Sequence, residues 1–208
     1  MTADDESLTR SERRRRSDAA ILKAAEQLFA EVGFERTTIR AVAARAGIDP
    51  ALVMQHYGSK QGLFAAAARW TGDHQRILSA TSDSFPRVAL DDLLELFEGG
   101  DREAAVALLR NCLTHPGAGR QLRDEVLCER TAAVRALLVG PDAELRAELL
   151  GACLLGLGLT RYLLEVPAVA AAGHDDLHRL MEPVLRALVD PPSVQPPPAA
   201  DQPPAQQD

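Results

Sequence analysis

The chain has 208 residues, of which 46% are hydrophobic and 25% charged, and this balance excludes a chain that is disordered throughout. The longest uncharged stretch, between Glu148 and Arg161, holds twelve residues, whereas a bilayer span needs about 18 to 20, so we expect no membrane segment. The three cysteines show no CxxC spacing, which argues against a disulfide framework and a closed zinc site. Since no secretory signal is readable near the N-terminus, we expect a cytoplasmic protein.

The formal net charge of −7 hides an asymmetry between two parts of the chain. Residues 10–60 carry ten Arg or Lys against six Asp or Glu, which gives +4. Residues 61–208 carry thirteen against twenty-one, which gives −8. A small basic unit joined to a larger acidic one is expected of a DNA reader with a separate control or assembly domain.

The first predicted helix begins after Ser17 or Asp18, either of which would act as its N-cap, and it stops at Gly33. Its apolar residues fall at helical spacing on one face: Ile21, Ala24, Ala25, Leu28, Phe29 and Val32. Residues 1–16 precede this helix and include the run Arg13 to Arg16. We interpret them as a flexible basic arm that either lies along a minor groove or phosphates or only solubilises the chain.

Two short helices are predicted next. A threonine, Thr37 or Thr38, caps the first of them, and Gly47 ends it. The pair Asp49-Pro50 supplies a cap and a residue preset to helical φ, so it begins a second helix that ends near Tyr57. Two short helices joined by a glycine-containing turn and supported by a third are typical of a helix-turn-helix, which places its second helix in the major groove of DNA.

A fourth helix, capped by Ser59, is predicted to run through Leu63 and Ala68 as far as Ile77 and Leu78. Further helical patterns lie at about 89–98, 101–114, 118–139, 142–165 and 174–189. Residues 191–208 contain seven of the thirteen prolines and little apolar bulk, so we expect a disordered tail there. Because no segment alternates as a strand would, the fold class is all-α.

Several segments within residues 17–65 match one family pattern, and they are Ala24-Ala25-Glu26-Gln27-Leu28-Phe29, Gly33-Phe34, Thr37-Thr38-Ile39, Ala43, Ala46-Gly47-Ile48, His56-Tyr57-Gly58-Ser59-Lys60 and Leu63-Phe64. Together they strongly resemble the amino-terminal domain of TetR-family transcriptional regulators. A weaker similarity, at residues 108–116 and 141–162, is to carboxy-terminal domains of actinobacterial members. The resemblance implies a helix-turn-helix DNA-binding domain at 17–63 and a larger helical ligand-binding and dimerisation domain at 64–190.

The residues that we expect to contact DNA lie on the second and third helices and at the start of the fourth. Thr38 suits a phosphate oxygen, although a plain helix cap explains it equally well. Arg40 is long enough to reach a guanine edge, or is simply a solvated arginine, and Lys60 adds a phosphate contact. Val53 and Tyr57 should face the core, which leaves six residues of the third helix on or near its exposed side: Pro50, Ala51, Leu52, Met54, Gln55 and His56.

Two of these positions depart from the family pattern. Met54 stands where the family usually has a tyrosine, and Leu52 stands where it often has a small hydroxyl residue. Both changes remove expected phosphate hydrogen bonds. Exposed Leu52 and Met54 would instead contact thymine methyl groups, while Gln55 would pair with adenine.

In the larger domain we expect the last two long helices to pair with those of a second copy, as the resemblance implies, through Leu155, Leu159, Leu177 and Leu185. Packing of the same faces within one chain is the alternative. A small apolar inducer is expected between the fourth helix and those spanning 101–165, in a pocket lined by leucines and alanines. Five further side chains are candidates for contacting it, unless they only cap or solvate helix ends: Trp70, Asn111, His115, Arg161 and Tyr162.

No enzyme chemistry is indicated, because none of the histidines lies beside a nucleophile turn or a phosphate-binding loop. His174 and His178 are four residues apart, but no third metal ligand is identifiable, so we expect no metal and no cofactor. The sequence therefore indicates a homodimeric TetR-like regulator, a repressor released from an inverted-repeat operator by a small apolar ligand. The alternative is a helical interaction protein or a DNA-organising protein with no inducer.

Overall fold

The computed structural model describes residues 9–69, 74–140 and 142–191. Every regular element in these ranges is a helix, so the expected all-α class is confirmed. The elements in chain order are α1 (Arg10–Arg36), α2 (Ile39–Ala46), α3 (Pro50–Tyr57), α4 (Lys60–Ala67), α5 (His74–Leu78), α6 (Phe85–Glu98), α7 (Arg102–Asn111), α8 (Pro116–Arg120), the π-helix η1 (Gln121–Leu127), α9 (Cys128–Arg135), α10 (Ala143–Gly158), the π-helix η2 (Leu159–Leu163), α11 (Pro167–Ala171) and α12 (His174–Val189).

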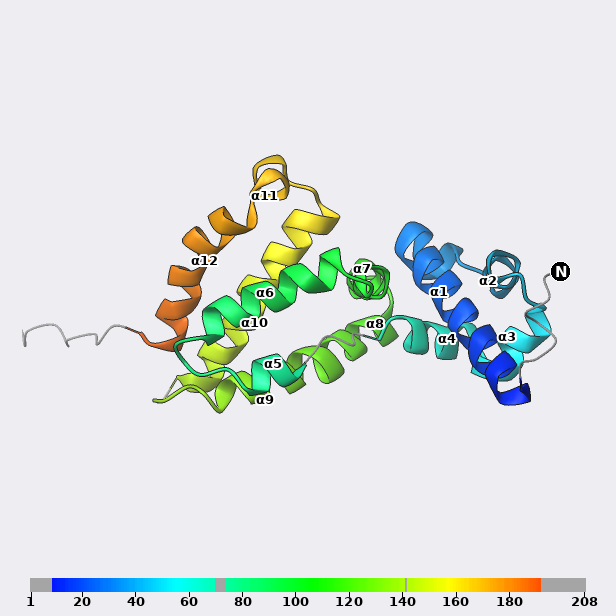
Figure 1. Cartoon of the computed structure of the whole chain (residues 1–208), viewed down its shortest axis with the longest axis horizontal. Helices are drawn as coiled ribbons and strands as arrows, with labels where there is room; N and C mark the ends of the chain where they lie inside the picture. The colour runs from blue at the N-terminus through cyan, green and yellow to red at the C-terminus, as the bar shows by residue number, and fades with distance from the viewer. Residues whose placement is uncertain (1–8, 70–73, 141, 192–208) are drawn as a thin grey trace, which may run out of the picture.

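The helices form two groups along the long axis of the molecule (Figure 1). Helices α1 to α4 gather at one end, and α5 to α12 form the larger part, with α12 at the opposite end. Helices α7 and α8 lie where the two groups meet, and α7 packs against α1. The N-terminal group therefore touches the larger one through a short, well-defined junction.

The start of α1 differs from the prediction. The helix begins at Arg10, and neither Ser17 nor Asp18 is its cap. Thr9 is the N-cap, because its side chain accepts a hydrogen bond from the amide of Glu12 at 3.2 Å while Glu12 Oε2 accepts one from the amide of Thr9 at 2.7 Å. The prediction of a flexible arm over residues 1–16 is therefore wrong for residues 10–16, and residues 1–8 lie outside the described ranges.

The helix-turn-helix follows the local signals closely. Gly33 breaks α1 with a φ of +79°, a conformation that favours glycine. Thr38 caps α2 by accepting from the amide of Ala41, and Gly47 ends α2 in the left-handed region. Asp49 caps α3 with Pro50 at its first position, as predicted.

The fourth helix is shorter than predicted. It ends at Ala67, because Ala68 leaves the helical region with a φ of −92° and a ψ of +24°. Ile77 and Leu78, which were predicted to continue this helix, belong to the separate helix α5.

Most of the C-terminal helices correspond to the predicted patterns with changed ends. The 118–139 pattern comprises three contiguous elements, α8, η1 and α9, and the 142–165 pattern comprises α10 and η2. Helix α12 has its predicted bounds, α6 begins four residues earlier than expected, and α11 was not predicted. Apart from Pro191, the predicted disordered tail falls outside the described residues.

Candidate DNA interface, domain junction and ligand cavity

Helix α3 presents the exposed side that the sequence predicts. Val53 is fully buried against the other N-terminal helices, whereas Pro50, Ala51 and Gln55 are exposed. Met54, a large apolar side chain, is 43% exposed. The outer face of α3 thus combines an apolar side chain with an amide, the two kinds of group that read thymine methyls and adenine edges.

Two residues of α3 are less accessible than expected. Leu52 is only partly exposed. The prediction that His56 lies on the exposed side is wrong for its side chain, which is 8% exposed. Its Nδ1 lies 3.1 Å from Oδ1 of Asp18 on α1, so the imidazole turns back onto the protein.

The same carboxylate holds Tyr57. The phenolic O–H donates to Oδ1 of Asp18 at 2.6 Å, so one acidic side chain of α1 binds two consecutive residues at the end of α3. The hydrogen bond from Tyr57, assisted by His56, lowers the pKa of Asp18 against the opposing effect of burial. Burial and the same hydrogen bond raise the pKa of Tyr57. The end of α3 is thereby fixed to α1.

The other predicted DNA-contacting side chains lie around α3. Thr38 is exposed, and its oxygen accepts from the amide of Ala41 at 3.1 Å, so the capping role is present and its O–H remains able to donate. Arg40 is exposed and makes no hydrogen bond or ion pair to the described residues. Lys60 is partly buried, and its ammonium donates to the carbonyl of Glu35 at 3.1 Å.

Asn111 and His115, two predicted ligand contacts, belong to the junction between the two groups of helices. Oδ1 of Asn111 accepts from the amide of Phe34, and its Nδ2 donates to the carbonyls of Phe29 and Ala107. The ring of His115 packs on Phe34 with 3.8 Å between centroids, and its Nδ1 accepts from the first turn of α8. Neither residue lines the apolar cavity described below, because Asn111 binds backbone groups of α1 and α7 while His115 packs on Phe34 and caps α8.

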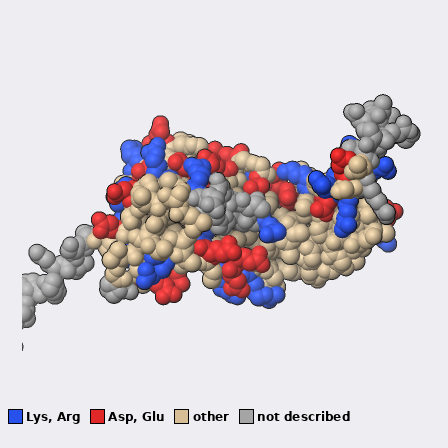
Figure 2. Space-filling view, turned by 60° about the horizontal axis from the view of Figure 1, so that its bottom comes forward, with Lys and Arg blue, Asp and Glu red and all other residues tan. Residues whose placement is uncertain are grey.

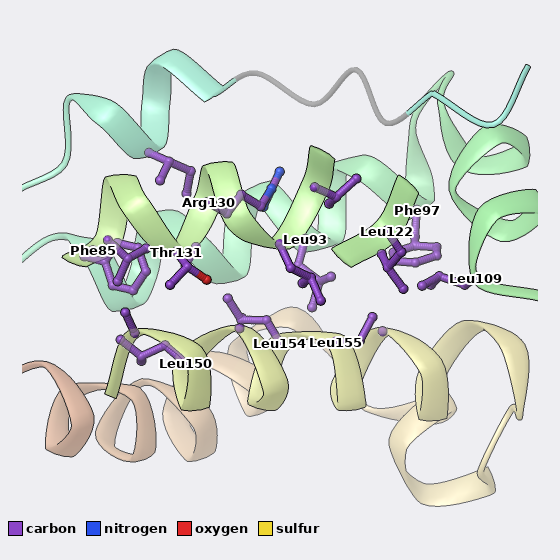
Figure 3. Close-up of a pocket in the computed structure, with 18 residues that line it drawn as sticks. Phe85, Leu93, Phe97, Leu109, Leu122, Arg130, Thr131, Leu150, Leu154 and Leu155 are labelled. Atoms are coloured by element: carbon purple, nitrogen blue, oxygen red, sulfur yellow. The ribbon is translucent and has the colours of Figure 1, made fainter. Parts of the chain in front are cut away.

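An apolar cavity lies between α6, η1, α9 and α10 (Figure 3). Leu150, Leu154 and Leu155 rise from α10 toward α9 and η1. The enclosed volume is about 50 Å³, which is far below the 300 Å³ or more of a typical small-molecule site. The remaining labelled side chains that line it are Phe85, Leu93, Phe97, Leu109, Leu122, Arg130 and Thr131.

The polar residues at this cavity differ from those predicted. Arg130 and Thr131 line it, and Arg130 donates to the buried Asp92 of α6 at 2.8 Å. The predicted Arg161 instead donates to the carbonyls of Val169 and Ala172.

Tyr162 also lies outside the cavity wall. Its ring stacks on Phe97, with 4.5 Å between centroids, and its O–H donates to Glu98. Trp70, the fifth predicted contact, lies outside the described residues. Helix pairing within the chain decides these positions, and local sequence carried no signal for Arg130 and Thr131.

Of the four residues expected at a dimer interface, two are buried within the chain and two are partly buried. Leu185 is 0% exposed and Leu177 is buried, so both belong to the core of the chain. Leu155 lines the cavity, and Leu159 is partly buried. The large apolar side chains that α10 and α12 do expose are Leu145, Leu149, Leu180 and Val184.

Within the described ranges, none of the helices combines the length and the apolarity that crossing a bilayer requires. The same residues form no group of three or more His, Cys, Asp or Glu side chains that would hold a metal ion. His174 pairs with Glu98, and His178 lies between Asp91 and Glu182.

Two family models match the chain. Residues 21–67 match the model of bacterial regulatory proteins of the tetR family, and residues 83–189 match the tetracyclin repressor-like C-terminal domain. The second match alone spans more than half of the chain.

The relatives found by sequence cover one segment. The HTH-type transcriptional repressor Rv3405c of Mycobacterium tuberculosis and the HTH-type transcriptional regulator Mb3439c of Mycobacterium bovis are each 50% identical to this chain over 48 residues. That segment is 23% of this chain and 26% of each relative, so the chain matches about a quarter of their length.

Solved structures extend the likeness over most of the chain. A TetR-family regulator from Streptomyces coelicolor is 26% identical with a TM-score of 0.56, over 88% of this chain and 99% of that one. NalD, the secondary repressor of the MexAB-OprM multidrug efflux pump in Pseudomonas aeruginosa, is 22% identical with a TM-score of 0.68, over 86% and 99%. The second likeness concerns the fold alone.

Proposed function

Since the chain belongs to the tetR family of bacterial regulatory proteins, we propose that it is a homodimeric repressor which leaves an inverted-repeat operator when a small apolar ligand binds. The family membership makes it a DNA-binding transcriptional regulator and not an enzyme. We assign DNA binding to residues 17–63, extended by the first turns of α1, and ligand binding and dimerisation to residues 64–190.

The outer face of α3 carries this proposal. Met54 and Gln55 are exposed side by side, with Arg40 of α2 unpaired within the described residues. This combination supports base reading in the major groove by α3, with Pro50 and Ala51 at its entry. Thr38 and Lys60 are the proposed phosphate contacts. Leu52 is only partly exposed, so it offers thymine methyl groups less surface than Met54, and the buried His56 side chain is withdrawn from the set.

The exposed apolar side chains of α10 and α12 support a dimer interface. Leu145 and Leu149 are one helical turn apart on α10, and Leu180 and Val184 are one turn apart on α12. Exposed aliphatic side chains at this spacing on two adjacent helices favour pairing with a second copy by twofold symmetry. A dimer would place its two α3 helices about one DNA turn, roughly 34 Å, apart, which is why we expect an inverted repeat.

The apolar cavity supports a ligand of mainly hydrocarbon character. Because it encloses only about 50 Å³, a ligand of ordinary size must separate α10 from α9 and η1 as it enters. Such a movement is a means of coupling to the junction at Asn111. Release from DNA needs a coupling free energy of about 1 to 3 kcal/mol, and operator DNA must then weaken ligand binding by the same factor.

Selection of genomic DNA fragments by the full-length protein tests the DNA-reading part. We expect the selected fragments to share an inverted repeat. The Arg40→Ala variant should bind this repeat less tightly and lose its base preference at one position of each half-site. Arg120→Ala is the matched control, because Arg120 is also exposed but lies on α8 in the larger group of helices. Equal loss of affinity in both variants, or no enriched repeat, would contradict the proposal.

The small cavity also favours a second candidate, a DNA-organising protein of the same fold without an inducer. Thermal-shift screening of apolar and amphipathic compounds, with and without the selected DNA, separates the two. A compound that stabilises the free protein and is displaced by DNA supports the inducible repressor. If the selected DNA does not change the binding of any compound to the protein, or if no compound binds, the second candidate is supported.

A further inference from the structure

The first turns of α1 carry a basic run in an ordered helix. The capping box of Thr9 and Glu12 begins the helix, and the four arginines Arg13 to Arg16 follow directly, all of them exposed. Glu12 is occupied by the cap, because its carboxylate accepts from the amide of Thr9. The basic side chains therefore project from a fixed backbone.

This part of α1 is attached to the recognition helix. Asp18, one turn beyond Arg14 and Arg15, accepts the hydrogen bond from Tyr57 and contacts His56. Figure 1 shows the beginning of α1 beside α3, at the end of the molecule opposite α12. Figure 2 shows some basic side chains at that end, beside acidic ones.

Helical spacing selects two of the arginines. Residues three and four positions before Asp18 lie on its side of α1, and these are Arg15 and Arg14. The pKa of Asp18 is lowered by Tyr57, then by His56, and also by the charge of Arg14, which is consistent with this common side. Arg15 makes only a 3.5 Å contact with Ser11 within the described residues.

We propose that Arg14 and Arg15 form a rigid phosphate-binding pair that grips the DNA backbone next to the bases read by α3. This inference rests on the proposed DNA-reading role of α3 and adds a second contact to it. The guanidinium group suits phosphate because its fork of N–H donors matches two phosphate oxygens. A capped helix presents the pair with less conformational entropy to lose than a flexible arm would have.

The test is the salt dependence of binding to a mixed-sequence DNA duplex of about 30 base pairs, measured by fluorescence anisotropy with the full chain. Each phosphate contact contributes about 0.9 to the slope of log affinity against log salt. The variant Arg14→Gln/Arg15→Gln should therefore lower the slope by about 1.8, so that raising salt from about 50 to 200 mM weakens it about tenfold less than the wild type. The matched control Arg123→Gln/Arg179→Gln removes the same charge from exposed sites on η1 and α12 and should keep the wild-type slope.

Two further variants test rigidity without removing any arginine. Thr9→Ala removes the cap and should lower the slope in the same direction, because the first turn frays. Glu12→Gln keeps a capping-box residue and should bind at least as tightly as the wild type.

If Arg14→Gln/Arg15→Gln keeps the salt slope of the wild type, the arginine pair is overturned. The DNA-reading role of α3 is not affected by that result, provided that the wild-type protein binds the duplex. Thr9→Ala that binds like the wild type also overturns it, since a flexible arm would behave in that way. A wild-type protein that binds no duplex overturns both the pair and the proposed function.

Discussion

The backbone amide of Phe34 donates to the side-chain oxygen of Asn111 at 2.7 Å, and this bond joins the end of α1 to the end of α7. Asn111 is only 2% exposed, and its Nδ2 group also donates to the carbonyls of Phe29 and Ala107. Gly33 adjoins this contact, and a Cβ built on it would lie 3.4 Å from Oδ1 of Asn111. One amide side chain thus connects α1 of the N-terminal group to α7 of the larger group.

Asn111→Ala should lower the free energy of unfolding by about 1 to 3 kcal/mol, because it leaves a buried N–H and two carbonyls without their partner. For a chain of this size each kcal/mol corresponds to about 2 to 4 °C in the melting temperature, which calorimetry resolves. Thr114→Ala, at an exposed site nearby, should stay within about 0.5 kcal/mol of the wild type. Equal melting of the two variants would show that this bond does not hold the junction.

Lys60→Ala should weaken binding to all operator sequences alike, because a phosphate contact carries no base information. It should also lower the melting temperature slightly, since the ammonium donates to the backbone carbonyl of Glu35 and lies 4.4 Å from the centre of the Phe34 ring.

Arg40→Ala should cost about 1 to 3 kcal/mol of binding free energy, should affect the preference at one base pair only, and should leave the melting temperature unchanged. Titration of single base-pair variants of the operator distinguishes the patterns, and identical profiles for both variants would refute the two roles.

Leu149→Glu and Leu185→Glu should impair different properties, dimer formation and stability respectively, although both place a carboxylate on the last two long helices. Leu149 is 42% exposed, so its variant should fold normally and sediment as a monomer with little operator affinity. Leu185 is completely buried, so its variant should lose several kcal/mol of stability, about 3 or more, through an unpaired buried charge. Sedimentation together with thermal melting checks both, and an intact Leu149→Glu dimer would move the interface elsewhere.

Asp18→Asn should reduce stability at neutral pH but not in acid. The pKa of Asp18 is lowered in the folded chain, mainly by the hydrogen bond from Tyr57, so its contribution is complete above the ordinary value of 3.8. That contribution is lost as the pH falls through the lowered folded-state pKa, where the wild-type carboxyl becomes protonated. Urea unfolding at a series of pH values should therefore show the two proteins converging in acid, and Tyr57→Phe should lose the same acid-dependent part. Parallel curves at all pH values would contradict the assignment.

The sequence by itself determined the all-α class and the helix-turn-helix, because caps and helix breaks are local. Thr38, Gly47 and the pair Asp49-Pro50 each act on backbone groups within a few residues. The true start of α1 was also present locally, because Thr9 and Glu12 have the spacing of a capping box and stand directly before the arginine run.

Only the tertiary structure decided which side chains those helices expose. His56 and Met54 both lie on α3, yet the His56 ring turns onto Asp18 of α1 while Met54 stays 43% exposed. Leu185 and Val184 are neighbours on α12, and the first is buried in the chain while the second is 46% exposed. The spacing of residues fixes which of them share a helix face. Whether that face meets another helix, a second copy or water depends on elements far away in the sequence, because burial is a property of packing between helices and not of any one of them.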